Sequence, residues 1–526
     1  MGCLLAVAAL ALASCDDFLT EDPKGQLSNS NFFASQEELE MSVNALYHQV
    51  CGMQNNSQNC DIIFQGDDYG ANYGSNKRTT QSIDVFNPLA NNKAVVTTWT
   101  GCYNVVKAAN YIVQNAERTP TTKEEVNIAI GQAKYWRAYA YFRLVRIWGP
   151  IPMPLDVSTN YERPLTSVDS VYAQIVADLT DCVNILPTSY NDGIRNISGA
   201  NIFITKQAAE STLAAVYMAM AGYPLNKGKE YYQKAAQCAL DVINGVDNGT
   251  YEYILEDDYS NVYDPSEHNY TNEVVVGINY SGTSGSEVDW FPKEQLFGSL
   301  GGWRGGVGEY RFWKAFPDGP RKDATYAPKI YWKGKLVDWW YKEGDDSIIE
   351  RHPMFINLQA GINNGKFDYT QPYWTAGPSY RTFRHRVVRY SEVLLWYAES
   401  QARADGTPND KAYECVNKVR KRAGLADLPQ GLSGEDFAAA ALAEHGWEVA
   451  GNFNAMVLRR DDELRMDILK EQFDIRKKNE PFEVVPGILT RAEDVIFDDD
   501  QEWKGDATIY WPYPEEDADI NPNLKR

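Results

Sequence analysis

Adjacent carboxylates are the residues of this sequence best suited to acid–base or metal chemistry. They occur as Asp67–Asp68 and in the run from Asp498 to Asp500, and such groups could act as general acid and base or ligate calcium. In a chain with a formal net charge of -22, adjacent acids are more typical of solvated loops. We therefore predict no catalytic residue and no cofactor. A structural calcium ion is the one metal that these acids would suit.

The motifs that position nucleophiles, phosphates and transition metals are missing. The sequence has no GxSxG, no phosphate-binding loop and no HExxH, and its eight cysteines include no CxxC pair. The glycine-rich run from Gly301 to Gly306 does not lie between a predicted strand and a predicted helix, as a dinucleotide-binding motif requires. One enzyme hypothesis stays open, in which two distant carboxylates are brought together at glycosidase spacing.

Aromatic residues offer a different chemistry. Phe, Trp and Tyr make up 13% of the chain, with 14 Trp and 33 Tyr. A sugar presents apolar C–H faces and a rim of hydroxyl groups, so flat rings beside hydrogen-bonding side chains suit it. One ring face contributes on the order of 1 kcal/mol, whereas millimolar affinity needs about 4 kcal/mol. A sugar site therefore needs two or three rings from several loops.

The surroundings of each ring separate predicted surface rings from predicted core rings. Tyr69 and Tyr73 lie between glycines, which favours an exposed loop. Trp290 and Trp303 lie in Gly/Ser-rich sequence without an apolar period. In the consecutive pair Trp339–Trp340, only one ring is expected to face inward. Helical patterns place the remaining rings in the core: Trp99, Trp136, Trp148, Trp396, and Trp313 with Phe312 and Phe316.

Charge and cysteines limit the partners and the compartment. The net charge of -22 and pI near 4.8 repel phosphate backbones, so nucleic acid is not an expected partner. Cys51 and Cys60 could close a short loop in an oxidising compartment. The cysteines that lie in helical patterns are expected to pack as small hydrophobic residues: Cys102, Cys182, Cys238 and Cys415.

Helices must hold these loops, and the central helix is predicted in GQAKYWRAYAYFRLVRIWGPIPMP, residues 131–154. At about 100° per residue, Trp136 and Leu144 fall on one side, and Phe142 and Val145 fall on the opposite side. A helix that is apolar on two sides must be sandwiched between other helices. The Gly-Pro pair after its last tryptophan predicts a sharp end, because proline cannot continue the helix.

Further helices are predicted on both sides of the central one. Capping boxes at Ser35–Glu38 and Thr121–Glu124 predict two helix starts. Apolar periodicity predicts helices around Trp99–Asn110, Val171–Leu186, Lys206–Ala221 and Tyr231–Ile243. Paired helices with alanines at close contacts resemble tetratricopeptide repeats, which stack into an arc. We predict a mainly α fold, a tetratricopeptide-like helical-repeat scaffold (α-α superhelix) with a loop-rich insertion that contains short strands.

Two regions lack the apolar periodicity of helices. Residues 51–92 are rich in Asn, Gly, Asp and Tyr and predict long surface loops. Residues 246–387 hold short apolar runs such as EVVVGINY, many glycines and seven tryptophans, and they predict the insertion. Helical texture returns in residues 388–526, which we expect to complete one globular unit with residues 15–245.

These patterns follow, in order, those of a known family. The central stretch resembles the pattern GEARFLRAYYYFDLVRLFGDVPL. RHRVVRYSEVLLWYAESQARADG and KAYECVNKVRKRAGL resemble lRYAEVLLMYAEA and a...iN.VR.RAGL, and IYWPYPEEDADINPNL is similar to PiP..e...NP.l. The chain thus resembles the SusD/RagB family of surface lipoproteins, which capture nutrients for the outer-membrane transporters of Bacteroidetes. HGWEVAGNFNAMVLRRDDELRMDIL only loosely matches the family's ERR.ELafEG.RW.DL.RW helix.

The resemblance implies a non-catalytic lipoprotein that binds an oligosaccharide or polysaccharide and passes it to a SusC-like TonB-dependent transporter. It places the ligand surface in Asp67–Arg78 and in Ser284–Trp313. The candidate ligand-binding residues are Asp67, Tyr69, Tyr73, Arg78, Trp290, Trp303, Arg304, Tyr310 and Trp374. Two alternatives remain open: a RagB-like peptide-binding lipoprotein with the same transporter role, and a secreted glycoside hydrolase.

The first residues predict export. The apolar run LLAVAALALAS is shorter than the roughly 20 residues that cross a bilayer and is typical of a signal peptide. It ends in Leu12-Ala13-Ser14-Cys15, which resembles a bacterial lipobox, so residues 1–14 are expected to be removed and Cys15 acylated. The resemblance implies a location on the outer membrane, exposed at the cell surface, with the lipid anchor as the only contact with the membrane.

Overall fold

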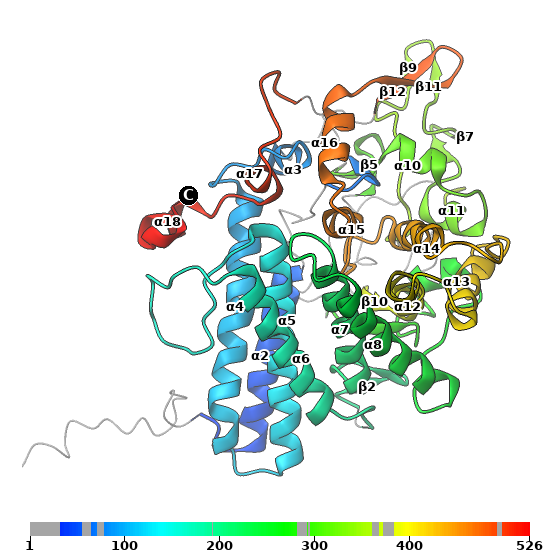
Figure 1. Cartoon of the computed structure of the whole chain (residues 1–526). Helices are drawn as coiled ribbons and strands as arrows, with labels where there is room; N and C mark the ends of the chain where they lie inside the picture. The colour runs from blue at the N-terminus through cyan, green and yellow to red at the C-terminus, as the bar shows by residue number, and fades with distance from the viewer. Residues whose placement is uncertain are drawn as a thin grey trace, which may run out of the picture.

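A layer of stacked helices forms most of the molecule, and short strands lie to one side of it (Figure 1). The structure is a computed structural model. It describes residues 32–54, 65–70, 78–191, 193–280, 292, 295–303, 305–359, 368–371, 383–491 and 497–525, with residues 78–80 described by their backbone only.

The stacked helices follow one another both in sequence and in space. They are α2 (Gln36–Gln54), α4 (Lys93–Asn115), α5 (Lys123–Trp148), α6 (Val168–Ile185), α7 (Lys206–Ala221), α8 (Lys229–Asp247), α12 (Tyr390–Asp405), α13 (Asp410–Arg422) and α14 (Gly434–Val449). Each helix from α2 to α8 packs against the next long helix, α8 packs against α12, and α12 packs against α13 and α14. This succession confirms the predicted mainly α, repeat-like scaffold.

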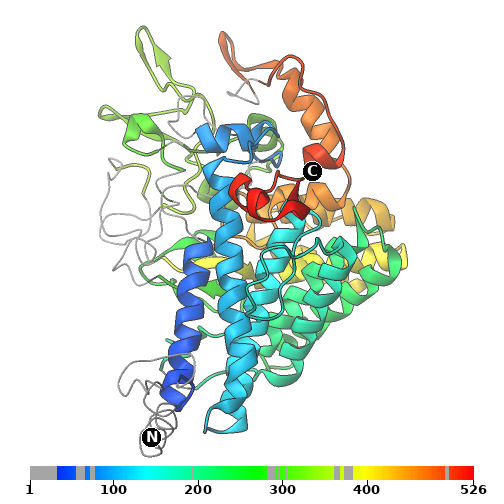
Figure 2. The same cartoon turned by 90° about the vertical axis from the view of Figure 1, so that its left-hand side faces the viewer.

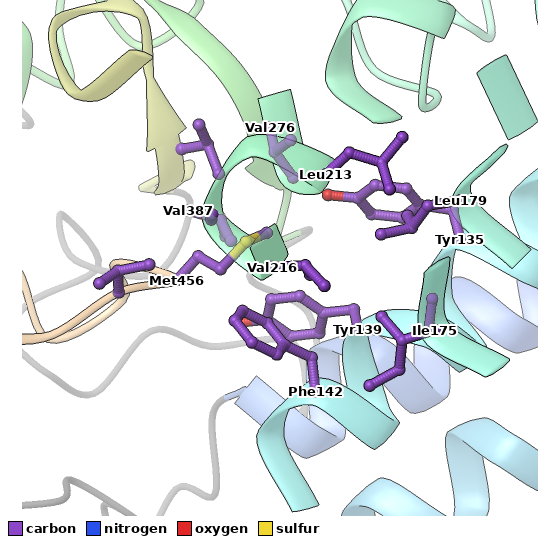
Figure 3. Close-up of a cluster of buried hydrophobic side chains, with 14 of the residues drawn as sticks. Tyr135, Tyr139, Phe142, Ile175, Leu179, Leu213, Val216, Val276, Val387 and Met456 are labelled. Atoms are coloured by element: carbon purple, nitrogen blue, oxygen red, sulfur yellow. The ribbon is translucent and has the colours of Figure 1, made fainter. Parts of the chain in front are cut away.

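Helix α5 lies at the centre of this layer, as its two apolar sides predict. It packs against α2, α4 and α6, and Trp136, Phe142 and Trp148 have no exposed surface. Figure 3 shows Tyr135 and Phe142 meeting side chains from α6, from α7 and from two strands. The helical layer and the strands therefore share one hydrophobic core.

The helix ends follow local chemistry, with two corrections to the predictions. Helix α5 begins one residue later than predicted, because the Thr122 side chain accepts a hydrogen bond from the Glu125 backbone N–H (3.2 Å). Gly149 ends it with a positive φ of 69°. Part of the segment predicted as loops is helical: α2 continues to Gln54 because its last turn buries Met53, and α3 spans Arg78–Asp84.

One two-stranded ladder joins an early part of the insertion to its end. Strands β4 (Val274–Ile278) and β10 (His385–Arg389) pair antiparallel, with His385 opposite Ile278 and Arg389 opposite Val274. All ten residues of the two strands are buried. The chain therefore leaves the helical layer at β4 and returns to it next to the same strand.

The remaining short elements lie in the insertion and the C-terminal part, except for one pair of strands between α6 and α7. Pairs of strands form four ribbons: β2 (Asn196–Ile197) with β3 (Ala200–Asn201), β6 (Ile330–Trp332) with β7 (Lys335–Val337), β8 (Lys342–Glu343) with β9 (Asp346–Ser347), and β11 (Pro481–Val485) with β12 (Ile488–Arg491). The short helices are α10 (Tyr310–Ala315), α11 (Pro320–Thr325), α15 (Arg459–Arg465), α16 (Leu469–Lys478), α17 (Asp506–Ile509) and α18 (Glu515–Ile520). Figure 2 shows the light-green ribbons of the insertion projecting away from the stacked helices.

The C-terminal segment folds back onto the end of α5. The Trp511 N–H donates to the Ile147 carbonyl (2.9 Å), and the Trp148 indole N–H donates to the Pro512 carbonyl (2.9 Å). These bonds satisfy groups at the C-terminal end of α5, where backbone carbonyls lack helical partners.

Candidate ligand-binding site

A two-stranded ribbon brings together the two segments that the sequence assigns to the ligand surface. Strand β1 (Tyr69–Gly70) pairs antiparallel with β5 (Val307–Gly308), with Tyr69 opposite Gly308. The Glu309 N–H extends the pairing by donating to the Asp68 carbonyl (3.1 Å). The early loop and the insertion, more than 200 residues apart in sequence, therefore meet at one place.

Tyr69 anchors this ribbon from inside, and its prediction as an exposed ring is wrong. Its side chain is 4% exposed, stacks on Phe355 (ring centroids 5.3 Å apart) and meets the edge of Phe453 (4.5 Å). The glycines around it serve close packing: a Cβ on Gly306 would lie 2.1 Å from the Tyr69 ring. Gly306, which is distant from Tyr69 in the sequence, thus lets the backbone next to β5 lie directly against the Tyr69 ring.

Asp67 is tied to helix α15. Its carboxylate accepts a hydrogen bond from Arg459 Nε (2.8 Å), and its backbone N–H donates to Glu463 Oε1 (3.0 Å). Burial alone would raise the pKa of Asp67, but the charge and hydrogen bond of Arg459 outweigh burial and lower this pKa. Burial and the Asp67 charge raise the pKa of Glu463 well above its usual value. An ion pair therefore fixes the segment that leads into β1.

Asp68 is the half-buried acid next to the ribbon. Burial, followed by the negative charge of Asp67, raises the pKa of Asp68 to about 7. Near neutral pH its carboxyl group is thus partly protonated and has both a donor and an acceptor for hydrogen bonds.

A cluster of aromatic rings lies beyond β5. Tyr310 is buried (3% exposed) and stacks on Trp313, so its prediction as a ligand-binding ring on the surface is wrong. Trp313 meets Trp339 (ring centroids 5.4 Å apart) and Trp340 (6.4 Å). Trp339 is buried while Trp340 is half-buried, which confirms that one ring of this pair faces inward. Trp303, four residues before β5, is also half-buried.

The segments around β1 and β5 thus carry half-buried indoles, at Trp303 and Trp340, and a half-buried carboxyl group, at Asp68. Indole rings suit the C–H face of a ligand, and a carboxyl group suits its hydroxyl groups.

Two family models match this chain. One, described as "Starch-binding associating with outer membrane", matches residues 17–218, and the SusD family model matches residues 320–526. The chain belongs to the SusD family. The family resemblance that the central helix and the later patterns indicated is thus confirmed.

Individual relatives match nearly the whole length of this SusD family member. It is 26% identical to SusD-like protein P2 of Formosa agariphila over 484 residues, which cover 85% of this chain and 87% of the relative. It is 24% identical to SusD-like protein P25 of the same organism over 502 residues (87% and 88%).

Solved structures of the family share the fold. A SusD homolog from Bacteroides thetaiotaomicron superposes with a TM-score of 0.76 at 20% identity, covering 94% of this chain and 97% of that one. A structure with xylogluco-oligosaccharide gives a TM-score of 0.71 at 19% identity (93% and 98%). A laminarin-binding SusD-like protein gives 0.68 at 18% identity (93% and 98%).

Several predicted residues of this SusD family chain fall outside the described part. These are Tyr73, Trp290, Arg304, Trp374, the lipobox Cys15, and Cys60 of the suggested disulfide. Arg78 is the first residue of α3, and only its backbone is described. Of the nine candidate ligand-binding residues, the structure therefore places Asp67 and Trp303 near β1 and β5 and moves Tyr69 and Tyr310 into the core.

Sequence reasoning missed the residues that hold the site from behind. Arg459 and Glu463 lie in the segment that matches the family pattern only loosely, and they contact Asp67 across almost 400 positions. Their four-residue spacing places both on one side of a helix, but no local pattern names a partner so distant in sequence.

Among the described residues, no three His, Cys, Asp or Glu side chains are grouped so that they could hold a metal ion. Within the same part of the chain, no helix combines the length and the apolarity needed to cross a membrane.

Proposed function

We propose that this protein binds an oligosaccharide or polysaccharide without cleaving it, at the surface formed around β1 and β5. The pairing of β1 with β5 carries the proposal, because it joins the two segments of the predicted ligand surface in a chain of the SusD family. The relatives with xylogluco-oligosaccharide and with laminarin in their descriptions support a glycan as the ligand.

Ring geometry supports the same ligand class. Trp303 and Trp340 are each half-buried, so part of each residue stays open to solvent, whereas Trp313 stacks on Tyr310 and has Lys322 Nζ over its ring (4.5 Å from the centroid). Two ring contacts at about 1 kcal/mol each, with two or three hydrogen bonds of about 1 kcal/mol, supply the roughly 4 kcal/mol that millimolar binding needs.

The acids around β1 favour binding over hydrolysis. Asp67 is held by Arg459, and Glu463 has no exposed surface. Of these three carboxyl groups, Asp68 is the one that is half-buried and makes no ion pair with a described residue, whereas glycoside hydrolysis uses two carboxyl groups on opposite sides of the scissile bond.

The location follows from the family and from the first residues. We propose that acyl chains on Cys15 anchor the protein to the outer membrane and that it delivers glycan to a SusC-like TonB-dependent transporter. The family model's description, starch binding in association with the outer membrane, supports the anchored location.

Affinity electrophoresis of the purified chain in gels with xyloglucan, laminarin or other glycans tests the proposal. We expect retardation by at least one glycan and no release of sugar products on incubation. Trp303→Ala should weaken retention about tenfold, because a lost ring contact of about 1 kcal/mol or slightly more corresponds to that factor.

Trp503→Ala is the matched control, since Trp503 is also half-buried but packs on Phe86 and Phe473, away from β1 and β5. It should leave retention unchanged. Equal retention of wild type and Trp303→Ala would contradict the site. Retention of tryptic peptides but of no glycan would favour the RagB-like alternative, and product release would favour a hydrolase.

A further inference from the structure

A second hollow lies far from β1 and β5, among the loops at the ends of α6, α7 and α8. Its volume is about 430 Å³, within the range of small-ligand sites, which is roughly 300–1,000 Å³. One wall comes from residues 188–191 and from residues 193, 196, 199 and 201 in and beside the β2–β3 ribbon, and the other comes from residues 250–253, 272, 274 and 275. In Figure 1, β2 lies at the lower ends of these helices, whereas β5 lies in the upper part of the molecule. We name this hollow the β2 groove.

Amides and tyrosines line the β2 groove. The side chains of Asn201, Gln207 and Asn272 contribute amides, and Tyr251 and Tyr253 contribute half-buried rings. None of the described lining residues is Lys, Arg or His, and the one carboxylate among them is an exposed Glu. Arg384 lies behind the wall and is 1% exposed, so a phosphate or carboxylate ligand would meet no cationic side chain among the described lining residues. Neutral hydrogen-bonding groups beside flat rings suit a neutral, hydroxyl-rich ligand.

The groove contains hydrogen-bonding atoms that the protein leaves unused. Gln207 belongs to the wall: it is 2% exposed, its amide nitrogen donates to the Thr188 carbonyl (2.7 Å), and its side chain also interacts with Tyr253. Asn201 Oδ1 accepts from the Tyr190 N–H (2.9 Å), while Asn201 Nδ2 donates to no described residue. The side chain of Asn272 makes no hydrogen bond with the described residues. Asn201 and Asn272 are both half-buried, so a ligand in the groove can reach these unused amide groups.

The walls of the groove are fixed before any ligand binds. The Tyr190 hydroxyl donates to the Ile204 carbonyl (2.7 Å), and the Ile204 N–H donates to Gln132 in the central helix (2.8 Å). Arg384 Nη2 donates to the Asn201 carbonyl (2.9 Å). A site held in place by its own protein contacts loses little conformational entropy on binding.

We propose that the β2 groove is a second carbohydrate site, which takes a neutral sugar residue. Its rings cover the C–H face of the sugar, and Asn201 and Asn272 exchange hydrogen bonds with the hydroxyl groups. The site does not depend on the surface around β1 and β5. Where both sites contact one long glycan, the second contact is intramolecular and strengthens retention of the polymer beyond that of short fragments.

Titration calorimetry of the full chain with short oligosaccharides tests this proposal. The probes are laminarihexaose, xyloglucan heptasaccharide and mannohexaose, with trigalacturonate as the anionic comparison. We expect at least one neutral probe to show a binding event that Asn272→Ala and Tyr251→Ala each weaken tenfold or more. Trp303→Ala should leave this event unchanged, and trigalacturonate should not produce it.

Two variants serve as controls. Tyr251→Phe keeps the ring and should retain binding within a factor of three. Asn244→Ala removes an exposed amide on α8 outside the groove and should have no effect. Because the Tyr251 ring also packs over Gly245, its alanine variant needs a melting curve, whereas Asn272→Ala removes no hydrogen bond with the described part of the protein.

The proposal is overturned if no neutral probe shows an event sensitive to Asn272→Ala and Tyr251→Ala, or if trigalacturonate binds as tightly as the neutral probes. An event lost in Trp303→Ala but intact in Asn272→Ala would leave the proposed function standing and remove the second site. The reverse result would support the second site and contradict the surface around β1 and β5.

Discussion

Replacing Glu448 by Gln should destabilise the protein and change how its stability depends on pH. Glu448 is fully buried in α14 and holds three guanidinium groups. Its Oε1 atom lies 2.6 Å from Arg389 Nη1 and also contacts Arg422, and its Oε2 atom lies 3.0 Å from Arg321 Nη1. These arginines come from β10, α13 and α11, so Glu448 joins the helical layer to the insertion.

The lowered pKa of Glu448 and the usual cost of breaking a buried ion pair both give the expected loss of unfolding free energy. Burial alone would raise the pKa of Glu448, but the charges of Arg422, Arg389 and Arg321 outweigh burial and lower this pKa from 4.5 to about 2. The difference corresponds to about 3 kcal/mol of folding free energy. Breaking a buried ion pair by removing one partner costs about 3–5 kcal/mol. We therefore expect Glu448→Gln to lower the free energy of unfolding at pH 7 by about 3 kcal/mol.

The same reasoning fixes the sign of the pH dependence. Because the folded state lowers the pKa of Glu448, its contribution is complete above pH 4.5 and disappears as the pH falls toward 2. Wild type and Glu448→Gln should thus differ by about 3 kcal/mol at pH 7 and by much less near pH 2.5. For a unit of 526 residues, 3 kcal/mol corresponds to a melting temperature about 3 °C lower at pH 7.

Urea unfolding followed by circular dichroism, at several pH values, measures both quantities. Glu502→Gln is the control, because Glu502 is exposed and makes no ion pair among the described residues; it should change stability by less than about 0.5 kcal/mol. A difference between wild type and Glu448→Gln below 1 kcal/mol at pH 7, or one that is equal at pH 7 and pH 2.5, would refute the reasoning.

Two further substitutions test the ribbon and the anchor. Gly306→Ala places a Cβ 2.1 Å from the Tyr69 ring, so it should lower the free energy of unfolding by about 1–3 kcal/mol and weaken glycan retention. Gly52→Ala is the control, because no atom lies within 4 Å of its new Cβ, and it should leave retention intact. Normal retention by Gly306→Ala would contradict the role of the ribbon. Cys15→Ala in the full-length protein should move it from the membrane fraction to the soluble fraction, and unchanged fractionation would contradict the predicted acylation.

The helical scaffold was predictable because its signals are local. The stretch from Gly131 to Trp148 shows two apolar sides, and a helix sandwiched between neighbours follows from that pattern alone. The boundary predicted for α7 agrees with the structure, while α5 starts at a cap one residue later than predicted. Adjacent threonines give nearly equal capping patterns, and the geometry of the preceding turn decides between them.

The site was less predictable because its contacts are distant in sequence. Tyr69 between glycines looked exposed, but its ring fills a space created by Gly306 and by Phe355, more than 230 residues away. The burial of Tyr310 was missed for the same reason, since Trp339 and Phe482, which cover its ring, lie in a later part of the insertion and in β11 of the C-terminal part. Burial of an aromatic residue in a loop depends on what the fold brings over it, which local composition does not encode.

The ionic network explains how one scaffold supports an insertion that serves as a binding surface. Arg389 and Glu273 lie at the end of the β4–β10 ladder and pair with each other; Glu273 also pairs with Arg422 of α13, and Arg389 pairs with Glu448 of α14. Because buried ion pairs must satisfy direction as well as distance, they fix the relative position of these elements more narrowly than apolar packing does. The ion pairs therefore hold the two strands that bound the insertion loops in position on the helical layer. Substitutions in the loops between these strands can change which ligand is bound without moving the site. Glu448→Gln tests this too: if the network sets the position of the insertion, the variant should lose glycan retention at temperatures where its helices remain folded.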